Sequence, residues 1–264
     1  MVVFSYSRRL FEGLFERSGQ VVFLFLETLA ELRHLHRRIK PTLLCMLQFG
    51  VNTLPLAAFI GFFVGMVTAL QTGAELKKLG LTDLLAGPLV GVAMMREMGP
   101  VITAVIICGR VGAAMTAELG TMVVTEEIDV LRSLGISPVR FLVLPRFVAS
   151  VTMVPALTAY SVMIGIWGGA LVSTRNLGVS STVFYNELFK SLKVHDIVSG
   201  MSKTVFFGAI IAIVCCQTGL TTTRGTEGVG RSTMRAVVVS LTAILISDYF
   251  LTRFGDPIIS WVLG

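Results

Sequence analysis

The sequence has few charged residues for its length. Asp, Glu, Lys and Arg together make up 14% of the 264 residues, against about 25% in a typical soluble domain. Hydrophobic residues make up 54% of the chain, and its mean hydropathy is +0.81. This balance excludes a disordered chain and argues against an ordinary soluble enzyme. It favours a membrane protein of one domain with several membrane-spanning helices.

Residue patterns for catalysis and metal binding are also missing. The four cysteines form no C-x-x-C pair and lie in apolar runs, which is typical of buried, unreactive thiols (Cys45, Cys108, Cys215 and Cys216). The three histidines lie near no set of residues suited to a metal, so we expect no metal site and no catalytic residue. The chain contains no Gly-Lys-Ser/Thr and therefore no P-loop. We expect no cofactor in this chain, and if ATP powers the protein, another chain must bind it.

Uncharged stretches predict where the chain crosses the membrane. Residues 41–74, 147–174 and 204–223 contain no Asp, Glu, Lys or Arg, and each is long enough to cross a hydrocarbon core of about 30 Å as a helix. Two further apolar stretches, 84 to about 115 and 235–263, contain a few charges, and we predict that they also cross. The predicted fold is all-α, with five transmembrane helices in a domain at 41–264.

Two prolines predict irregular spans. Pro55 lies near the middle of the first stretch and Pro100 follows Arg96 and Glu97 in the second. A proline inside a helix removes one backbone hydrogen bond and bends the helix. We therefore expect a kinked or broken first span, and a break beside the two charged residues of the second.

The basic residues predict the orientation. With the N-terminus inside, the cytoplasmic segments hold thirteen Lys and Arg, seven of them before residue 41, whereas the external loops hold five. Cytoplasmic loops of membrane proteins carry this excess of basic residues, which predicts an N-in, C-out topology. The same excess explains the net charge of +6 without any nucleic-acid partner.

Residues 1–40 have the pattern of an amphipathic helix. Apolar residues recur at mostly helical spacing from Leu10 to Leu32, opposite a glutamate-containing stripe that Leu24 interrupts. A basic cluster follows at 33–40. This pattern predicts an interfacial helix on the membrane surface that leads into the first span. A soluble helix that packs on a partner is the alternative.

Ionisable residues inside the predicted spans are the strongest physical signal. An Arg, Lys or Asp at mid-helix costs roughly 2.5–3.5 kcal/mol on insertion scales, so such residues usually face a cavity or a partner. Arg96, Glu97, Lys203 and Asp248 are in this position. Arg96 and Glu97 are adjacent and point about 100° apart, so each needs a partner on another span. Two interpretations stay open: ion pairs that hold spans together, and a polar lining for a substrate.

The segment between the second and third spans predicts a short amphipathic helix on the cytoplasmic side. Val124, Ile128, Leu131 and Leu134 form one face, and the acids precede Arg132 in the order that favours a helix. Such a helix could dock into a groove of a partner or simply lie at the membrane surface.

Several ordered motifs resemble one family. They are the stretches 65–71 (GMVTALQ), 96–100 (REMGP), 109–120 (GRVGAAMTAELG), 125–129 (TEEID), 145–147 (PRF) and 165–169 (GIWGG). Together they resemble the MlaE/YrbE permeases of MCE-type ABC transporters over about residues 45–250. The resemblance implies a half-transporter that works as a homodimer in a bacterial inner membrane and moves phospholipids between the inner and outer membranes. It implies three partners: ATPase subunits that bind ATP and Mg²⁺, an external MCE-domain protein, and a small STAS-domain protein.

The resemblance also implies roles for individual residues. The lipid site would include Arg96, Glu97, Lys203, Arg235 and Asp248. A coupling helix at about 118–134 would meet the ATPase, with these polar residues: Glu118, Glu126, Glu127, Asp129 and Arg132. Within the lipid site, Arg96 and Lys203 could together hold a phosphate.

Two other function classes stay open. A secondary transporter would use Glu97 and Asp248 as proton relays and would need no ATPase. A non-transporting scaffold would use the same charges only as structural pairs.

Overall fold

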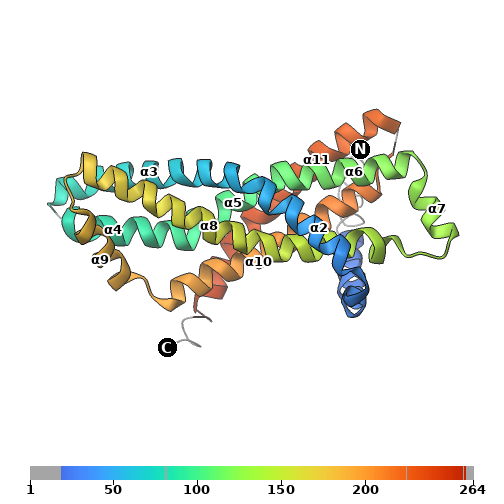
Figure 1. Ribbon diagram of the computed structural model, residues 1–264, viewed down its shortest axis with the longest axis horizontal. Helices are drawn as coiled ribbons and strands as arrows, with labels where there is room; N and C mark the ends of the chain where they lie inside the picture. The colour runs from blue at the N-terminus through green and yellow to red at the C-terminus, as the bar shows by residue number, and fades with distance from the viewer. Residues whose placement is uncertain (1–18, 81, 224, 258, 260–264) are drawn as a thin grey trace, which may run out of the picture.

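The computed structural model describes residues 19–80, 82–223, 225–257 and 259. The described residues form helices joined by short turns, with no strand among them. Within this part of the chain, five stretches are long and apolar enough to cross a membrane: Ile39–Leu79, Leu84–Val124, Val139–Asn176, Val194–Leu220 and Gly225–Gly255. We refer to them as spans one to five. They confirm the five predicted crossings, and Figure 1 shows them side by side in one elongated bundle.

Most spans consist of more than one helical segment. The first span contains α2 (Ile39–Phe49), the 3-10 turn η2 (Val51–Thr53) and α3 (Leu54–Leu79). The second contains α4 (Thr82–Ala93), η3 (Met94–Met98), α5 (Gly99–Ile107), η4 (Cys108–Gly112) and α6 (Ala113–Val124). The third contains η5 (Val139–Val143) and α8 (Leu144–Asn176). The fourth is α10 (Val194–Leu220), and the fifth contains α11 (Gly225–Phe250) and η6 (Leu251–Gly255).

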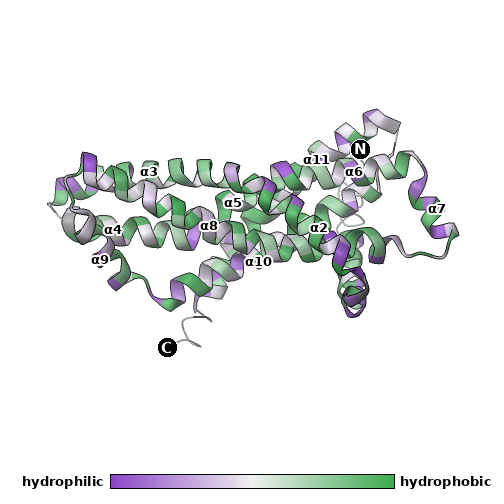
Figure 2. Ribbon diagram, viewed as in Figure 1, coloured by the Kyte–Doolittle hydropathy of each residue, from purple (hydrophilic) through white to green (hydrophobic). Residues whose placement is uncertain are grey.

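Short helices lie at the two ends of the bundle. The helix α7 (Glu127–Ser133) joins spans two and three, and α9 (Ser181–Ser191) joins spans three and four. Figure 1 shows α7 and the N-terminal segment near one end of the molecule and α9 at the other. We call these the α7 end and the α9 end. Hydrophilic residues are prominent on α7 and on the N-terminal segment, whereas apolar residues dominate the helices between the two ends (Figure 2).

The predicted break in span one is present, although it lies just before Pro55. The chain leaves the α-helix at Gly50, passes through η2 and resumes a helix at Leu54, with Pro55 in its first turn. A proline fits there because the first turn of a helix needs no N–H donor. Arg110 of span two donates to the carbonyl oxygen of Asn52 and, over 2.8 Å, to Oγ1 of Thr53. The break is therefore bound by a side chain of the neighbouring span.

Glycines bring spans one and three into close contact. A Cβ atom added to Gly65 would lie 1.8 Å from the carbonyl oxygen of Gly165, and one added to Gly61 would lie 2.4 Å from Oγ of Ser161. Backbones of membrane helices approach closely only where side chains are this small. Gly109 differs, because a Cβ added there would meet no described atom within 4 Å.

The N-terminal segment docks on span three, and it keeps its predicted faces only in part. Residues 19–31 are helical and η1 (Leu32–Arg38) connects them to α2, while residues 1–18 of the predicted helix lie outside the described residues. Leu24, which interrupts the polar stripe, is buried in the core, whereas Val22 and Leu26 of the apolar stripe are exposed. The Glu31 carboxylate binds Arg140 through two hydrogen bonds of 2.8 and 3.0 Å. Val22, Phe23 and Leu26 therefore form an exposed apolar face on this helix.

Candidate functional site

A wide turn in span two begins the site. Residues Met94–Met98 form a π-turn, which carries one residue more than a regular helical turn. The sequence predicts a break here because Pro100 cannot donate to the carbonyl of Arg96. The structure widens the helix instead, and the free carbonyl oxygen of Arg96 accepts a hydrogen bond of 3.2 Å from Nζ of Lys203. The proline thus creates an acceptor inside the bundle, and span four supplies its donor.

Lys203 lies at the centre of the first polar cluster. Its residue is 1% exposed, and its ammonium group donates to Oε1 of Glu97 and to Oγ1 of Thr252, over 2.7 Å each. It also forms an ion pair of 3.4 Å with Oδ1 of Asp248. Spans two, four and five therefore meet at one lysine. The structure brings together three of the predicted site residues, Glu97, Lys203 and Asp248, and the sequence gives no signal for Thr252.

Arg96 belongs to a second cluster beside the first. One guanidinium nitrogen, Nη2, lies 2.6 Å from Oδ2 of Asp256, and Nε lies 3.6 Å from Oδ1 of Asp196. Ser199 donates to the other carboxylate oxygen of Asp256. His195 lies against both acids, with Nδ1 3.6 Å from Oδ1 of Asp196 and Nε2 3.2 Å from the backbone oxygen of Asp256. None of these four partners is among the predicted site residues.

Acidic groups outnumber permanent cations in these two clusters. Arg96 and Lys203 face four carboxylates, those of Glu97, Asp196, Asp248 and Asp256. Both cations are therefore already paired with carboxylates in this arrangement. Arg96 is the more accessible of the two, with 33% of its side chain exposed.

Arg235 lies away from both clusters. It is an exposed residue of α11, thirteen residues before Asp248, which corresponds to about 20 Å along a helix. The fifth span begins at Gly225 rather than at the predicted residue 235, so Arg235 lies within it, toward the α7 end. The structure therefore groups four of the five predicted lipid-site residues and leaves the fifth apart.

The predicted coupling segment is divided between two elements. Residues 118–124 belong to α6 and so to span two, where Glu118 forms an ion pair of 2.9 Å with Nη2 of Arg146. Arg146 is buried and also donates to the carbonyl oxygen of Leu142. Glu118 thus ties span two to span three. The other four predicted residues lie on α7 or on the turn that leads into it.

The helix α7 begins at a strained residue. Glu126, which precedes it, has a φ of 60° and a ψ of 10°, a left-handed conformation that costs a non-glycine residue about 1–2 kcal/mol. Ile128 is buried in the core and Leu131 packs against it, whereas Leu134 is exposed. The predicted apolar face is therefore used only in part for packing, and Leu134 at its end remains free.

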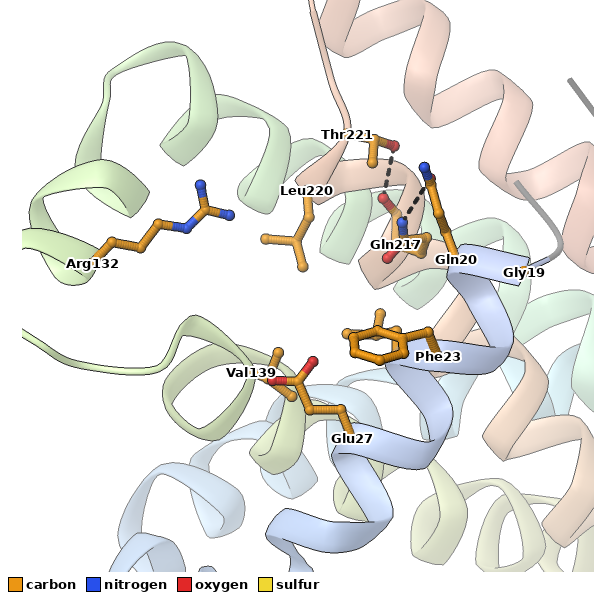
Figure 3. A pocket seen from close by; sticks show the side chains of 10 residues that line it. Gly19, Gln20, Phe23, Glu27, Arg132, Val139, Gln217, Leu220 and Thr221 are labelled. Atoms are coloured by element: carbon orange, nitrogen blue, oxygen red, sulfur yellow. Dashed lines mark hydrogen bonds between the residues drawn. The ribbon is translucent and has the colours of Figure 1, made fainter. Parts of the chain in front are cut away.

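A cavity of about 480 Å³ lies at the α7 end. Figure 3 shows Phe23 and Glu27 of the N-terminal helix on one side, with Arg132 and Leu220 across the opening. Oε1 of Gln20 accepts a hydrogen bond of 3.3 Å from Gln217 at one edge. The cavity therefore lies between the N-terminal helix, α7 and the end of span four.

The pKa of Glu31 is lowered below its usual value, chiefly because Arg140 donates hydrogen bonds to its carboxylate. The Nδ1 atom of His34 lies 2.9 Å from the same carboxylate. Arg38, a few residues further on, packs its guanidinium over the ring of Phe141 at 4.3 Å. The turn η5 is thus bound to the N-terminal segment at two neighbouring positions.

Comparison with known proteins assigns this bundle to a family. The family Permease MlaE matches residues 42–254, which include all five spans almost completely. The chain belongs to the MlaE permease family. A probable ABC transporter permease protein of Synechocystis is 42% identical over 211 residues, which cover 80% of each chain. A probable ABC transporter permease protein of Rickettsia typhi is 39% identical over 79% of this chain and 80% of its own length.

A plant relative extends the comparison. The protein TRIGALACTOSYLDIACYLGLYCEROL 1, chloroplastic, of Arabidopsis thaliana is 39% identical over 90% of this chain and 65% of its own length. The relatives of this chain therefore include a protein named as chloroplastic as well as bacterial proteins. As a member of this family, the present chain is a multi-pass membrane permease of the ABC transporter class.

Proposed function

We propose that this MlaE permease forms the membrane path of a transporter that moves phospholipids between the inner and outer membranes of a bacterium. The chain would work as a homodimer in the inner membrane. ATPase subunits, with ATP and Mg²⁺, would bind at its α7 end, together with a small STAS-domain protein. An MCE-domain protein would bind at the α9 end, and the topology would be N-in and C-out.

The observation that carries this proposal is the pair of polar clusters in an otherwise apolar bundle. Arg96 lies twelve residues after Leu84, where span two begins, which places it roughly 18 Å from that end of the span. A phospholipid needs apolar walls for its acyl chains and a few polar groups for its headgroup. The partly exposed Arg96 and Glu97 supply such groups at a defined depth.

Span five supports a dimer. Only 17% of its most apolar window is buried within one chain, against 28% to 56% in the other spans. The exposed residues are large and apolar and extend over the whole helix, with Met234, Val238, Leu245, Ile246, Tyr249 and Phe250 among them. A second copy on this face would place the polar clusters of both chains beside a shared cleft.

The α7 end supports coupling to an ATPase. Glu126 and Glu127 are exposed, and Leu134 supplies an apolar contact at the other end of α7. A short helix with an apolar end and several acids fits a groove on a partner. Glu126 has its left-handed backbone at an energetic cost, so the surrounding structure must hold this acidic turn in place.

The test is ATP-dependent lipid movement by the purified complex in vesicles. The complex of permease, ATPase and MCE-domain protein should carry two permease copies, retain phospholipid and transfer it only when ATP is hydrolysed. Transport by the permease alone, driven by a proton gradient, would instead establish a secondary transporter. A complex that neither binds nor moves phospholipid would leave a structural scaffold.

Reversal of two charges tests the coupling role. Glu126→Arg with Glu127→Arg should leave membrane insertion unchanged and abolish the stimulation of ATP hydrolysis by the permease. Glu75→Arg is the matched control, because Glu75 is an exposed acid at the opposite end of the bundle. Full stimulation in the double variant would contradict the assignment of α7.

A further inference from the structure

Asp256 binds the guanidinium group of Arg96 through an N–H donor that a phosphate would also use. The 2.6 Å contact between Nη2 of Arg96 and Oδ2 of Asp256 is the shortest that this guanidinium makes. Guanidinium groups bind carboxylates and phosphates through the same planar set of N–H donors. A lipid phosphate at Arg96 and the carboxylate of Asp256 would therefore compete for the same donors.

The two acids on Arg96 differ in how firmly they are held. Asp196 is fixed to the start of span four, because its Oδ2 also accepts a hydrogen bond of 3.0 Å from the backbone N–H of Lys193. Asp256 comes directly after η6 at the end of span five, the span that is least buried in the bundle. Asp196 therefore keeps a backbone anchor when Arg96 is released, whereas the Asp256 carboxylate is bound by the side chains of Arg96 and Ser199.

The balance of charge favours the same exchange. Four carboxylates face two permanent cations in the combined clusters, so an added phosphate would increase an existing excess of negative charge. When one carboxylate moves away from Arg96, the local excess of negative charge falls at the point where the phosphate binds. The Lys203 cluster does not offer the same exchange, because its ammonium group is buried and makes three hydrogen bonds.

We propose that Asp256 is a displaceable partner of Arg96: the phosphate of a bound phospholipid takes its place on the guanidinium, and the released carboxylate detaches the chain directly after η6 from spans two and four. Asp256 also accepts a hydrogen bond from Ser199, and its backbone oxygen lies 3.2 Å from Nε2 of His195. Its departure therefore breaks contacts of span five with both span two and span four. This inference rests on the proposed function, because it names how the headgroup site is closed when no lipid is bound.

The test is a double-mutant comparison of lipid retention. The complex is loaded from vesicles of an anionic phospholipid, and the phospholipid that stays bound after washing is measured by mass spectrometry. Asp256→Asn should increase retention roughly three- to tenfold, the factor that corresponds to the net contribution of about one ordinary hydrogen bond. In an Arg96→Gln background the same substitution should change nothing. Glu227→Gln is the matched control, because it neutralises an exposed acid at the far end of span five, and it should retain lipid as the wild type does.

The outcomes separate this inference from the proposed function. If the wild type retains and transports phospholipid but Asp256→Asn retains no more, with normal yield and dimerisation, the displacement is wrong and the transport function stands. If Asp256→Asn has the same effect with and without Arg96, Asp256 acts through the fold alone and the inference is overturned. A wild type that binds no phospholipid overturns the proposed function itself.

A crosslink tests the movement even if Asp256→Asn folds poorly. Cysteines replace Ser199 and Asp256, whose side chains are in contact, in a chain whose four native cysteines are replaced by alanine. Oxidation should block transport of the anionic phospholipid, and a reducing agent should restore it. Unchanged transport in the fully oxidised protein would show that span five need not leave, and would overturn the inference.

Discussion

Replacement of Lys203 by methionine is expected to destabilise the fold strongly. The change keeps most of the side-chain volume but removes the ammonium group that binds Glu97, Thr252 and the carbonyl oxygen of Arg96. It also leaves Asp248, 3.4 Å away, without its cation. The loss of one partner of a buried ion pair typically costs about 3–5 kcal/mol. We expect a loss of that order for Lys203→Met.

The assay is thermal unfolding of the purified protein in detergent, followed by the loss of the dimer peak in size-exclusion chromatography. Arg253→Met is the matched control, since Arg253 is an exposed cation of span five with no ion pair among the described residues. Such a surface change should stay within about 0.5 kcal/mol. Asp248→Asn should restore part of the stability in the Lys203→Met background, because it removes one uncompensated charge. Equal unfolding temperatures for the wild type and Lys203→Met would refute the structural role of this lysine.

Three further predictions follow from packing, charge and backbone strain. Gly65→Ala should abolish folded protein, because its Cβ would overlap the backbone of span three, whereas Gly109→Ala should leave the yield unchanged. The Arg140 contact lowers the pKa of Glu31. The stability that this contact adds to the fold is therefore complete above the unfolded-state pKa of Glu31 and is lost as the pH falls through the lowered value. Thermal unfolding should show that Glu31→Gln is less stable than the wild type at pH 7 and that the difference shrinks at acidic pH. Glu126→Gly should raise stability by about 1 kcal/mol, since glycine adopts the left-handed conformation without strain, and an unchanged unfolding temperature would contradict that strain.

Much of the fold could be predicted from the sequence, because membrane crossings depend on local composition. The uncharged stretches 41–74 and 147–174 lie inside spans one and three. The stretch 204–223 lies in span four and extends only a few residues beyond its end. The ends of the spans were less accurate. The fourth span begins at Val194 rather than at 204, which moves Lys203 from the edge of a span into its interior. A charged residue such as Lys203 fits equally well just outside a span or inside it, so the sequence alone cannot place the start of the span.

The candidate site could be predicted only in part, because its contacts join distant residues. Glu97, Lys203 and Asp248 were expected to need partners, and they are partners of one another. The residues Asp196 and Asp256 were not expected, since an acid near the end of a span usually means only a solvated terminus. The pairing of Glu118 with Arg146 was missed for a similar reason, because a cytoplasmic helix explained that glutamate equally well.

The π-turns in the spans determine the directions in which the side chains on either side of them point. In the part of the chain that the structure describes there are four π-turns, and each contains one arginine: Arg96, Arg110, Arg140 and Arg253. An inserted residue turns the remainder of a helix by about 100° relative to a regular one. Arg96 and Arg110 therefore owe their directions to the turns that carry them. Deletion of one residue from η3 would restore a regular α-helix and would rotate one half of span two relative to the other. Arg96 and Glu97 could then no longer both face their partners on spans four and five. Span two therefore cannot lose a residue there without losing the polar clusters.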